Sequence, residues 1–118
     1  MQAADAVVDF GPYDQDGNGE VDVVNIIHQG TGEENGTFGA ATDIWSHSWD
    51  LESAAYFGYG GTGAVSVDSG ARTVNAYVIQ PELLAPGVMS TIGVFCHEYG
   101  HALSLPDLYD TDYNDGGL

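Results

Sequence analysis

Cysteine and the cationic residues lysine and arginine are almost absent from this sequence, which has one cysteine, Cys96, and one cationic side chain, Arg72. A single cysteine excludes an intramolecular disulfide bond. A single cation against eighteen Asp and Glu residues gives a formal net charge of -17, which repels nucleic acid and anionic membranes. No apolar run approaches the roughly 18 residues of a membrane-spanning helix. We therefore expect no nucleic-acid partner and no membrane insertion.

The sequence has enough apolar residues for one domain and too few residues for two separate cores. Hydrophobic residues make up 43% of the 118 positions, which is typical of a globular domain. The first residues, 1–5, have neither a basic region nor an apolar segment, so we expect no signal peptide in this chain. We expect residues 1–118 to form a single domain.

β-prone segments precede one strong helix, and this order predicts an α+β fold rather than alternating βαβ units. A turn at Ser69-Gly70 between two short β-prone runs indicates a hairpin. Pro81 and Pro86 are expected to break the chain, and Pro106 to end the helix. The expected strands cover 21–28, 43–51, 64–68 and 72–80, and the expected helix runs from 89 or 90 to 105.

The predicted helix has an apolar stripe that we expect to face the core. Its members recur at helical spacing, and they are Ile92, Phe95, Cys96, Tyr99 and Leu103. Helix geometry places Cys96 in this stripe, so the sequence predicts a buried, unreactive thiol.

The other half of the same helix carries His97, Glu98 and His101, the HExxH pattern of zinc peptidases. The two histidines are four residues apart, so both imidazoles can reach a single ion. Glu98 lies beside them and can take a proton from a water molecule, as a general base does. The pattern therefore predicts a catalytic zinc site, whereas the simplest alternative is a helix with two surface histidines.

The segment that contains this pattern, residues 93–110, reads GVFCHEYGHALSLPDLYD. It resembles the immune inhibitor A-like family of secreted bacterial metalloproteases, whose members carry a similar HExGHxLGLPDLYD segment. The resemblance implies zinc ligands at His97, His101 and Asp107, with Glu98 as general base. It also implies a secreted endopeptidase that hydrolyses protein or peptide substrates. The fold it implies is zincin-like, with a twisted mixed sheet packed against the active-site helix.

Two features depart from the family pattern. Ser104 stands where the family has a glycine. A left-handed backbone there would strain serine by about 1–2 kcal/mol, whereas a slightly different turn would avoid the strain and make Asp110 a competing third ligand. No methionine follows Asp107, although proteases of this broad class have a methionine-containing turn downstream of the third ligand. We therefore expect a fragment of a catalytic domain that lacks its C-terminal subdomain, and that subdomain or a propeptide is a candidate partner.

An acidic loop near the N-terminus has oxygen ligands at alternating positions, as calcium loops do. The predicted calcium ligands are Asp14, Asp16, Asn18, Glu20 through its carbonyl, and Asp22. The twelfth position of the loop is an asparagine and a strand follows, so the loop is not an EF-hand. The alternative is an acidic turn without an ion.

Three functions are consistent with these patterns. The leading one is a zinc endopeptidase domain in which Glu98 activates the attacking water. The second is a metal-binding but catalytically inactive or truncated domain, which Ser104 and the missing methionine favour. The third is a calcium-stabilised structural module in which HExxH is accidental.

Overall fold

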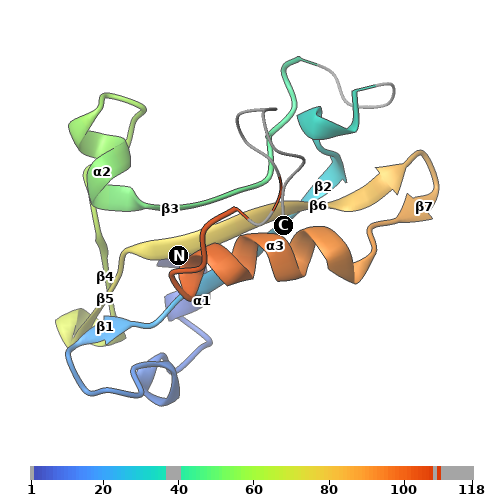
Figure 1. The fold of residues 1–118 in the computed structure, drawn as a ribbon. Coiled ribbons are helices and arrows are strands. Elements are labelled where there is room, and N and C mark those ends of the chain that lie inside the picture. The colour runs from blue at the N-terminus through green and yellow to red at the C-terminus, as the bar shows by residue number, and fades with distance from the viewer. Residues whose placement is uncertain (1, 37–40, 108, 110–118) are drawn as a thin grey trace.

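A computed structural model describes residues 2–36, 41–107 and 109 (Figure 1). It contains three α-helices, three 3-10 helices and seven strands in these described residues. In chain order they are α1 (Gln2–Asp5), η1 (Gly11–Tyr13), β1 (Glu20–Val21), β2 (Val24–Thr31), η2 (Glu33–Asn35), β3 (His47–Asp50), α2 (Leu51–Tyr56), β4 (Val65–Val67), η3 (Asp68–Gly70), β5 (Arg72–Val74), β6 (Ala76–Ala85), β7 (Val88–Met89) and α3 (Ile92–Ala102). No helix in this part of the chain is long and apolar enough to cross a membrane.

The larger sheet is built around β6, the longest strand, and has the order β2-β6-β3 with β7 also paired to β6. β2 runs parallel to β6, whereas β3 and β7 run antiparallel to it. Among the described strands β3 pairs with β6 alone, so it forms one edge of this sheet. Figure 1 shows α3 lying along β6, and α3 packs against both β6 and β3. The fold is thus mixed α and β with a mixed sheet against the long helix, as expected.

The smaller sheet has the order β1-β5-β4, with β1 parallel and β4 antiparallel to β5. The expected hairpin at Ser69-Gly70 is confirmed, and Asp68 and Ser69 take positive φ angles of 51° and 57° in its turn. Phe10 and three valines of this sheet form a small core, together with a half-buried alanine of α1 and the first valine of β2. The core valines are Val21, Val67 and Val74.

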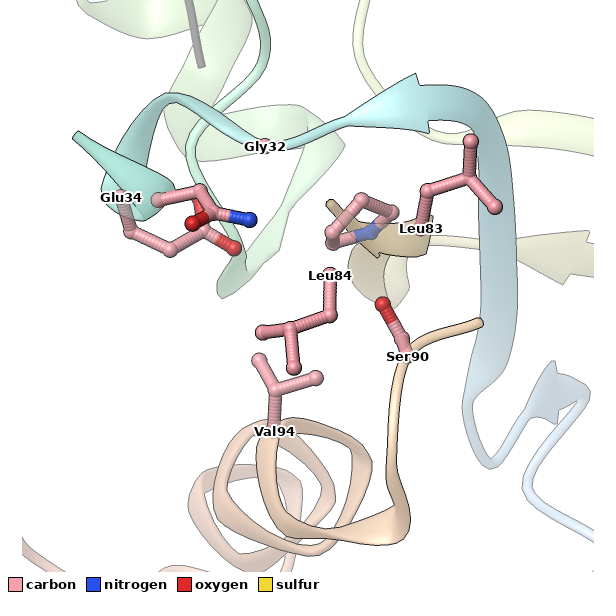
Figure 2. A pocket seen from close by; sticks show the side chains of 8 residues that line it. Gly32, Glu34, Leu83, Leu84, Ser90 and Val94 are labelled. Atoms are coloured by element: carbon pink, nitrogen blue, oxygen red, sulfur yellow. The ribbon is translucent and has the colours of Figure 1, made fainter. Parts of the chain in front are cut away.

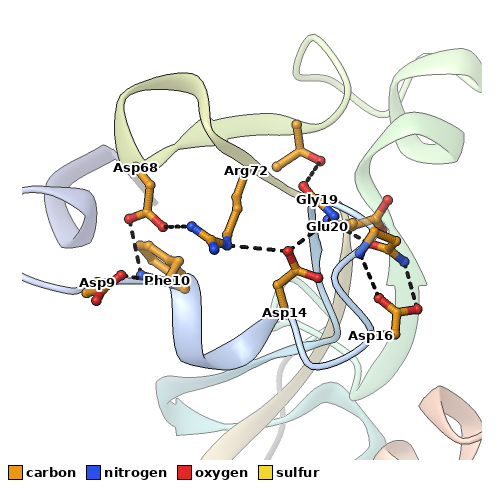
Figure 3. Close-up of polar contacts among 11 residues, drawn as sticks. Asp9, Phe10, Asp14, Asp16, Gly19, Glu20, Asp68 and Arg72 are labelled. Atoms are coloured by element: carbon orange, nitrogen blue, oxygen red, sulfur yellow. Dashed lines mark hydrogen bonds and ion pairs between the residues drawn. The ribbon is translucent and has the colours of Figure 1, made fainter.

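The single cation of the chain joins the N-terminal segment to the smaller sheet (Figure 3). Arg72 on β5 lies with Nη1 3.1 Å from Oδ2 of Asp68 and with Nε 3.4 Å from Oδ2 of Asp14. Asp68 also accepts a hydrogen bond from the backbone N–H of Phe10 at 3.1 Å. Arg72 therefore pairs with two carboxylates that come from different parts of the chain.

The segments around β3 and β6 differ from the sequence prediction. The strand expected over 43–51 is only four residues long, because Asp50 caps α2 by accepting a hydrogen bond from the N–H of Ser53 at 2.7 Å. Pro81 was expected to break the chain, yet it lies inside β6. The last pairing of β6 with β3 is at Ile79, so the missing N–H of Pro81 removes no hydrogen bond to β3. The expected strand 21–28 splits into β1 and the later β2.

The orientation of α3 is the largest correction. The helix spans Ile92–Ala102, shorter at both ends than expected, and its buried residue is Glu98. The stripe expected to face the core is largely exposed, with Ile92 76% and Leu103 62% accessible, and Cys96 is exposed as well. Helical spacing predicts which residues share a face, but the packing on β6 and β3 determines which face is covered. Here the face that carries Glu98 meets the sheet.

Candidate metal centre

Three side chains around the end of α3 bring one potential ligand atom each to a common point. Nε2 of His97 and Nε2 of His101 are 3.2 Å apart. Oδ1 of Asp107 is 3.3 Å from the first nitrogen and 3.2 Å from the second. Among the described residues, these are the His, Cys, Asp and Glu side chains that gather closely enough to hold one ion. The sequence-predicted trio is therefore brought together, whereas Asp110 lies outside the described residues.

The three atoms form a nearly equilateral triangle of the size that zinc requires. A tetrahedral zinc ion with bonds of about 2.0–2.1 Å holds its ligand atoms about 3.3–3.4 Å apart. The side chains of His97 and Asp107 are 36% and 35% exposed, so one side of the triangle is open to solvent. Two imidazoles, one carboxylate and an open position are the ligand set of a catalytic zinc site. The residues present fit this metal.

The ring of His101 is oriented by the turn that ends the helix. Its Nδ1 lies 2.9 Å from the carbonyl oxygen of Leu105. Because a carbonyl oxygen only accepts hydrogen bonds, Nδ1 carries the ring proton and donates the hydrogen bond. Nε2 then keeps its lone pair for a metal, which is the usual arrangement of a ligating histidine. The turn is closed by the N–H of Leu105, which donates to the carbonyl of Gly100 at 3.0 Å.

Of the two turns considered for Ser104, the structure has the left-handed one, with a φ of 66°. Its N–H donates to the carbonyl oxygen of His101 at 2.8 Å. This conformation reverses the chain directly after α3 and returns Asp107 to the two histidines. The turn that glycine makes at low cost is therefore made by serine, at about 1–2 kcal/mol.

Glu98 lies beside the triangle, on the face of α3 that meets the sheet. It is 6% exposed, and this burial raises the pKa of its carboxyl group. The positive charge that His97, His101 and His47 carry when protonated lowers the pKa, and the carboxylate of Glu34 raises it. A carboxylate with a raised pKa binds a proton more readily, which suits a general base.

Two residues near Glu98 could not be placed there from the sequence, because both come from distant segments. Glu34, in η2, accepts hydrogen bonds from the N–H of Ser46 at 3.2 Å and from its hydroxyl at 2.5 Å. His47, the first residue of β3, has Nε2 3.0 Å from the hydroxyl of Tyr77 and Nδ1 2.7 Å from the carbonyl of Trp45. Neither residue has a local sequence pattern that marks it as part of the site.

A cavity of about 220 Å³ opens between η2, β6 and α3 (Figure 2). Four of its lining residues are apolar, and Glu34 and Asn35 contribute the polar groups of one wall. The apolar residues are Pro81, Leu83, Leu84 and Val94. Val94 precedes Glu98 by four residues, so the cavity lies about one helical turn from the general base candidate.

The acidic loop is held by hydrogen bonds between its own residues (Figure 3). Asp16 accepts hydrogen bonds from the N–H and the amide of Asn18 at 3.0 and 3.1 Å, and Asn18 accepts one from the N–H of Glu20 at 2.7 Å. Oδ2 of Asp14 accepts from the N–H of Gly19 at 3.1 Å, whereas its buried Oδ1 has no hydrogen-bond partner. In the described part of the chain no three carboxylates of this loop lie close enough to share an ion. The geometry gives the calcium expectation no support.

Known proteins match the chain along nearly its whole length. Residues 6–118 match the family described as immune inhibitor A peptidase M6, catalytic domain. A protein named immune inhibitor A from Bacillus thuringiensis subsp. alesti is 36% identical over 129 aligned positions, which cover 98% of this chain and 18% of the relative. Pre-pro-metalloprotease PrtV from two Vibrio cholerae serotype O1 strains is 37% identical over 116 positions, which cover 89% of this chain and 12% of each relative.

The chain thus spans less than a fifth of the length of the curated relatives that it matches. The family match covers the histidine pair, the glutamate between them and the carboxylate that closes the triangle. The chain belongs to the immune inhibitor A peptidase M6 family.

Proposed function

We propose that this chain provides the zinc-binding catalytic region of a secreted endopeptidase with a zincin-like fold. The observation that supports it most directly is the triangle of Nε2 of His97, Nε2 of His101 and Oδ1 of Asp107, with sides of 3.2–3.3 Å. Family membership supports peptide hydrolysis, and the name of the Vibrio relatives, pre-pro-metalloprotease, supports both hydrolysis and export. In this proposal the three residues are the zinc ligands.

Bound zinc would supply a Lewis acid that polarises the scissile carbonyl and makes a neighbouring water more acidic. The chain's own contribution to the reaction is proton transfer by Glu98. A carboxylate oxygen of Glu98 accepts the proton of the water whose oxygen attacks the carbonyl carbon, and then delivers it to the nitrogen of the leaving amine. The burial that raises the pKa of Glu98 favours the first transfer. The backbone of the substrate lies along the free edge of β3, next to His47.

The test is made on the full-length protein. Elemental analysis should find one zinc per chain, and Glu98→Ala should keep the zinc while casein cleavage falls by at least about a thousandfold. Glu52→Ala, at an exposed glutamate of α2, is the control and should keep both properties. Zinc without turnover in the wild-type protein would favour the second function, a metal-binding domain that is inactive.

Calcium binding by the acidic loop stays a separate proposal, supported by the ligand spacing in the sequence alone. Binding would require Asp16 and Asn18 to exchange their mutual hydrogen bonds for an ion. A calcium titration followed by thermal melting tests it: a rise in Tm that Asp16→Ala abolishes supports the site. An unchanged Tm at millimolar calcium would contradict the calcium-binding proposal.

A further inference from the structure

The cavity beside α3 has the chemistry of a site for a long, positively charged side chain. Its walls are the aliphatic groups of Pro81, Leu83, Leu84 and Val94, and its charged group is the carboxylate of Glu34. Figure 2 shows Glu34 reaching toward this space from η2, with Leu84 and Val94 below it. A volume of about 220 Å³ holds a single side chain rather than a separate ligand molecule.

The carboxylate of Glu34 is held in place. The hydroxyl and N–H of Ser46 bind one oxygen each, and Ser46 is 4% exposed. These two hydrogen bonds leave further lone pairs on both oxygens, since a carboxylate offers about four acceptor positions. A fixed negative charge therefore lines a cavity whose other walls are mostly apolar. An apolar substrate side chain would leave that charge without a counter-ion, which is costly in a partly desolvated place.

The position of the cavity connects it to the reaction. Val94 and Glu98 are one turn apart on the same face of α3, so a side chain in the cavity belongs to a residue at or next to the scissile bond. The formal net charge of -17 attracts cationic peptides to the chain over a longer range.

We propose that this cavity is a specificity site for a lysine or arginine side chain of the substrate next to the scissile bond. The aliphatic stem lies along Leu84 and Val94, as the stems of such side chains do on apolar surfaces. The ammonium or guanidinium group pairs with the carboxylate of Glu34. The inference rests on the proposed peptidase function and adds the class of residue that the enzyme selects.

The first experiment maps the bonds that the full-length protein cleaves in a peptide library. Lysine and arginine should be enriched at one position beside the cut, and kcat/KM for a matched lysine peptide should exceed that of its norleucine analogue by about tenfold or more, the scale of one partly screened charge pair. Glu34→Gln, which keeps an acceptor for Ser46, should lower kcat/KM for the lysine peptide to that of the norleucine analogue and leave the zinc content in place. Glu33→Gln is the control, because Glu33 is the adjacent acid and does not line the cavity.

The second experiment separates the cavity from the chemistry. In the Glu98→Ala background, a fluorescent lysine peptide should bind more tightly than the norleucine peptide, and Glu34→Gln should abolish this difference. Leu84→Trp narrows the cavity at a half-exposed position and should weaken binding of the lysine peptide. Cleavage with no basic preference, or a preference that survives Glu34→Gln, overturns the specificity site and leaves the peptidase proposal intact. Absence of both zinc and cleavage overturns the peptidase proposal instead.

Discussion

Ser104 donates its backbone N–H to the carbonyl oxygen of His101 at 2.8 Å while its φ angle is 66°. One residue thereby ends α3 and turns the chain back toward it. Asp107, the proposed third ligand, reaches the two histidines because of this turn. The cost of the left-handed serine is a property that mutation can measure.

Ser104→Gly should stabilise the metal-free protein by about 1 kcal/mol, because glycine adopts positive φ without steric cost. Urea unfolding in the presence of a chelator measures the change. Ser66→Gly is the matched control in β4, where the backbone is extended, and it should lower the free energy of unfolding by about 0.5–1 kcal/mol. Equal effects of the two substitutions would contradict the strain at Ser104.

The identity of the third ligand can be tested with two neighbouring aspartates. Asp107→Ala should weaken zinc binding by at least about a hundredfold, because it removes one of three ligands. Asp110→Ala should leave the affinity within about twofold if Asp107 is the ligand, since nothing is then removed from the coordination shell. Competition with a chromogenic chelator gives both dissociation constants. The opposite ranking would assign the ligand role to Asp110.

The burial of Glu98 predicts a pH-dependent stability of the metal-free protein. Burial raises the pKa of this carboxyl in the folded state, so the folded chain binds the proton more tightly than the unfolded chain does. The resulting stability is fully present below the unfolded pKa and is lost as the pH rises through the folded pKa. Glu98→Gln does not titrate, so its stability relative to wild type should rise across that window and then level off. Urea unfolding at several pH values, with chelator, measures this difference, and a pH-independent difference would contradict it.

Arg72 should be unusually important for stability, because no second cation can replace it. The side chain of Asp14 is 6% exposed, and Arg72→Met leaves this carboxylate without its counter-charge. We expect a loss of about 1–3 kcal/mol, less than for a fully buried pair because Arg72 is 28% exposed. Asp14→Asn in the Arg72→Met background should recover part of the loss. Urea unfolding of the wild type, the two single variants and the double variant gives the coupling energy between Arg72 and Asp14. A coupling energy near zero would contradict the pairing.

The close approach of the three proposed metal ligands could be predicted from the sequence because their geometry is local. Helical spacing sets the separation of His97 and His101, and a tight turn sets the return of Asp107. The covered face of α3 was predicted wrongly, since Cys96 and Leu103 are exposed. Spacing alone does not say which side of a helix meets a sheet.

The surroundings of the site depend on contacts between distant segments. Glu34 comes from η2 and Ser46 from the segment before β3, and neither has a local pattern that places it near α3. Pro81 illustrates the same limit, because its tolerance inside β6 depends on where β3 ends. Pairing between strands that are far apart in the sequence determines all of these positions.

The three proposed ligands fall within residues 97–107, so assembling them closes a chain segment of about ten residues and needs no strand pairing. Glu34 and Val94, in contrast, face the same cavity only after β2 and β6 have paired across some fifty residues. Short closures form in about 10–100 ns, whereas pairing of distant strands is slow. In terms of the proposed roles, an unfolded or newly made chain would assemble its zinc ligands before it forms the cavity proposed to select substrates. The sequence separation of the residues sets the order of these two events.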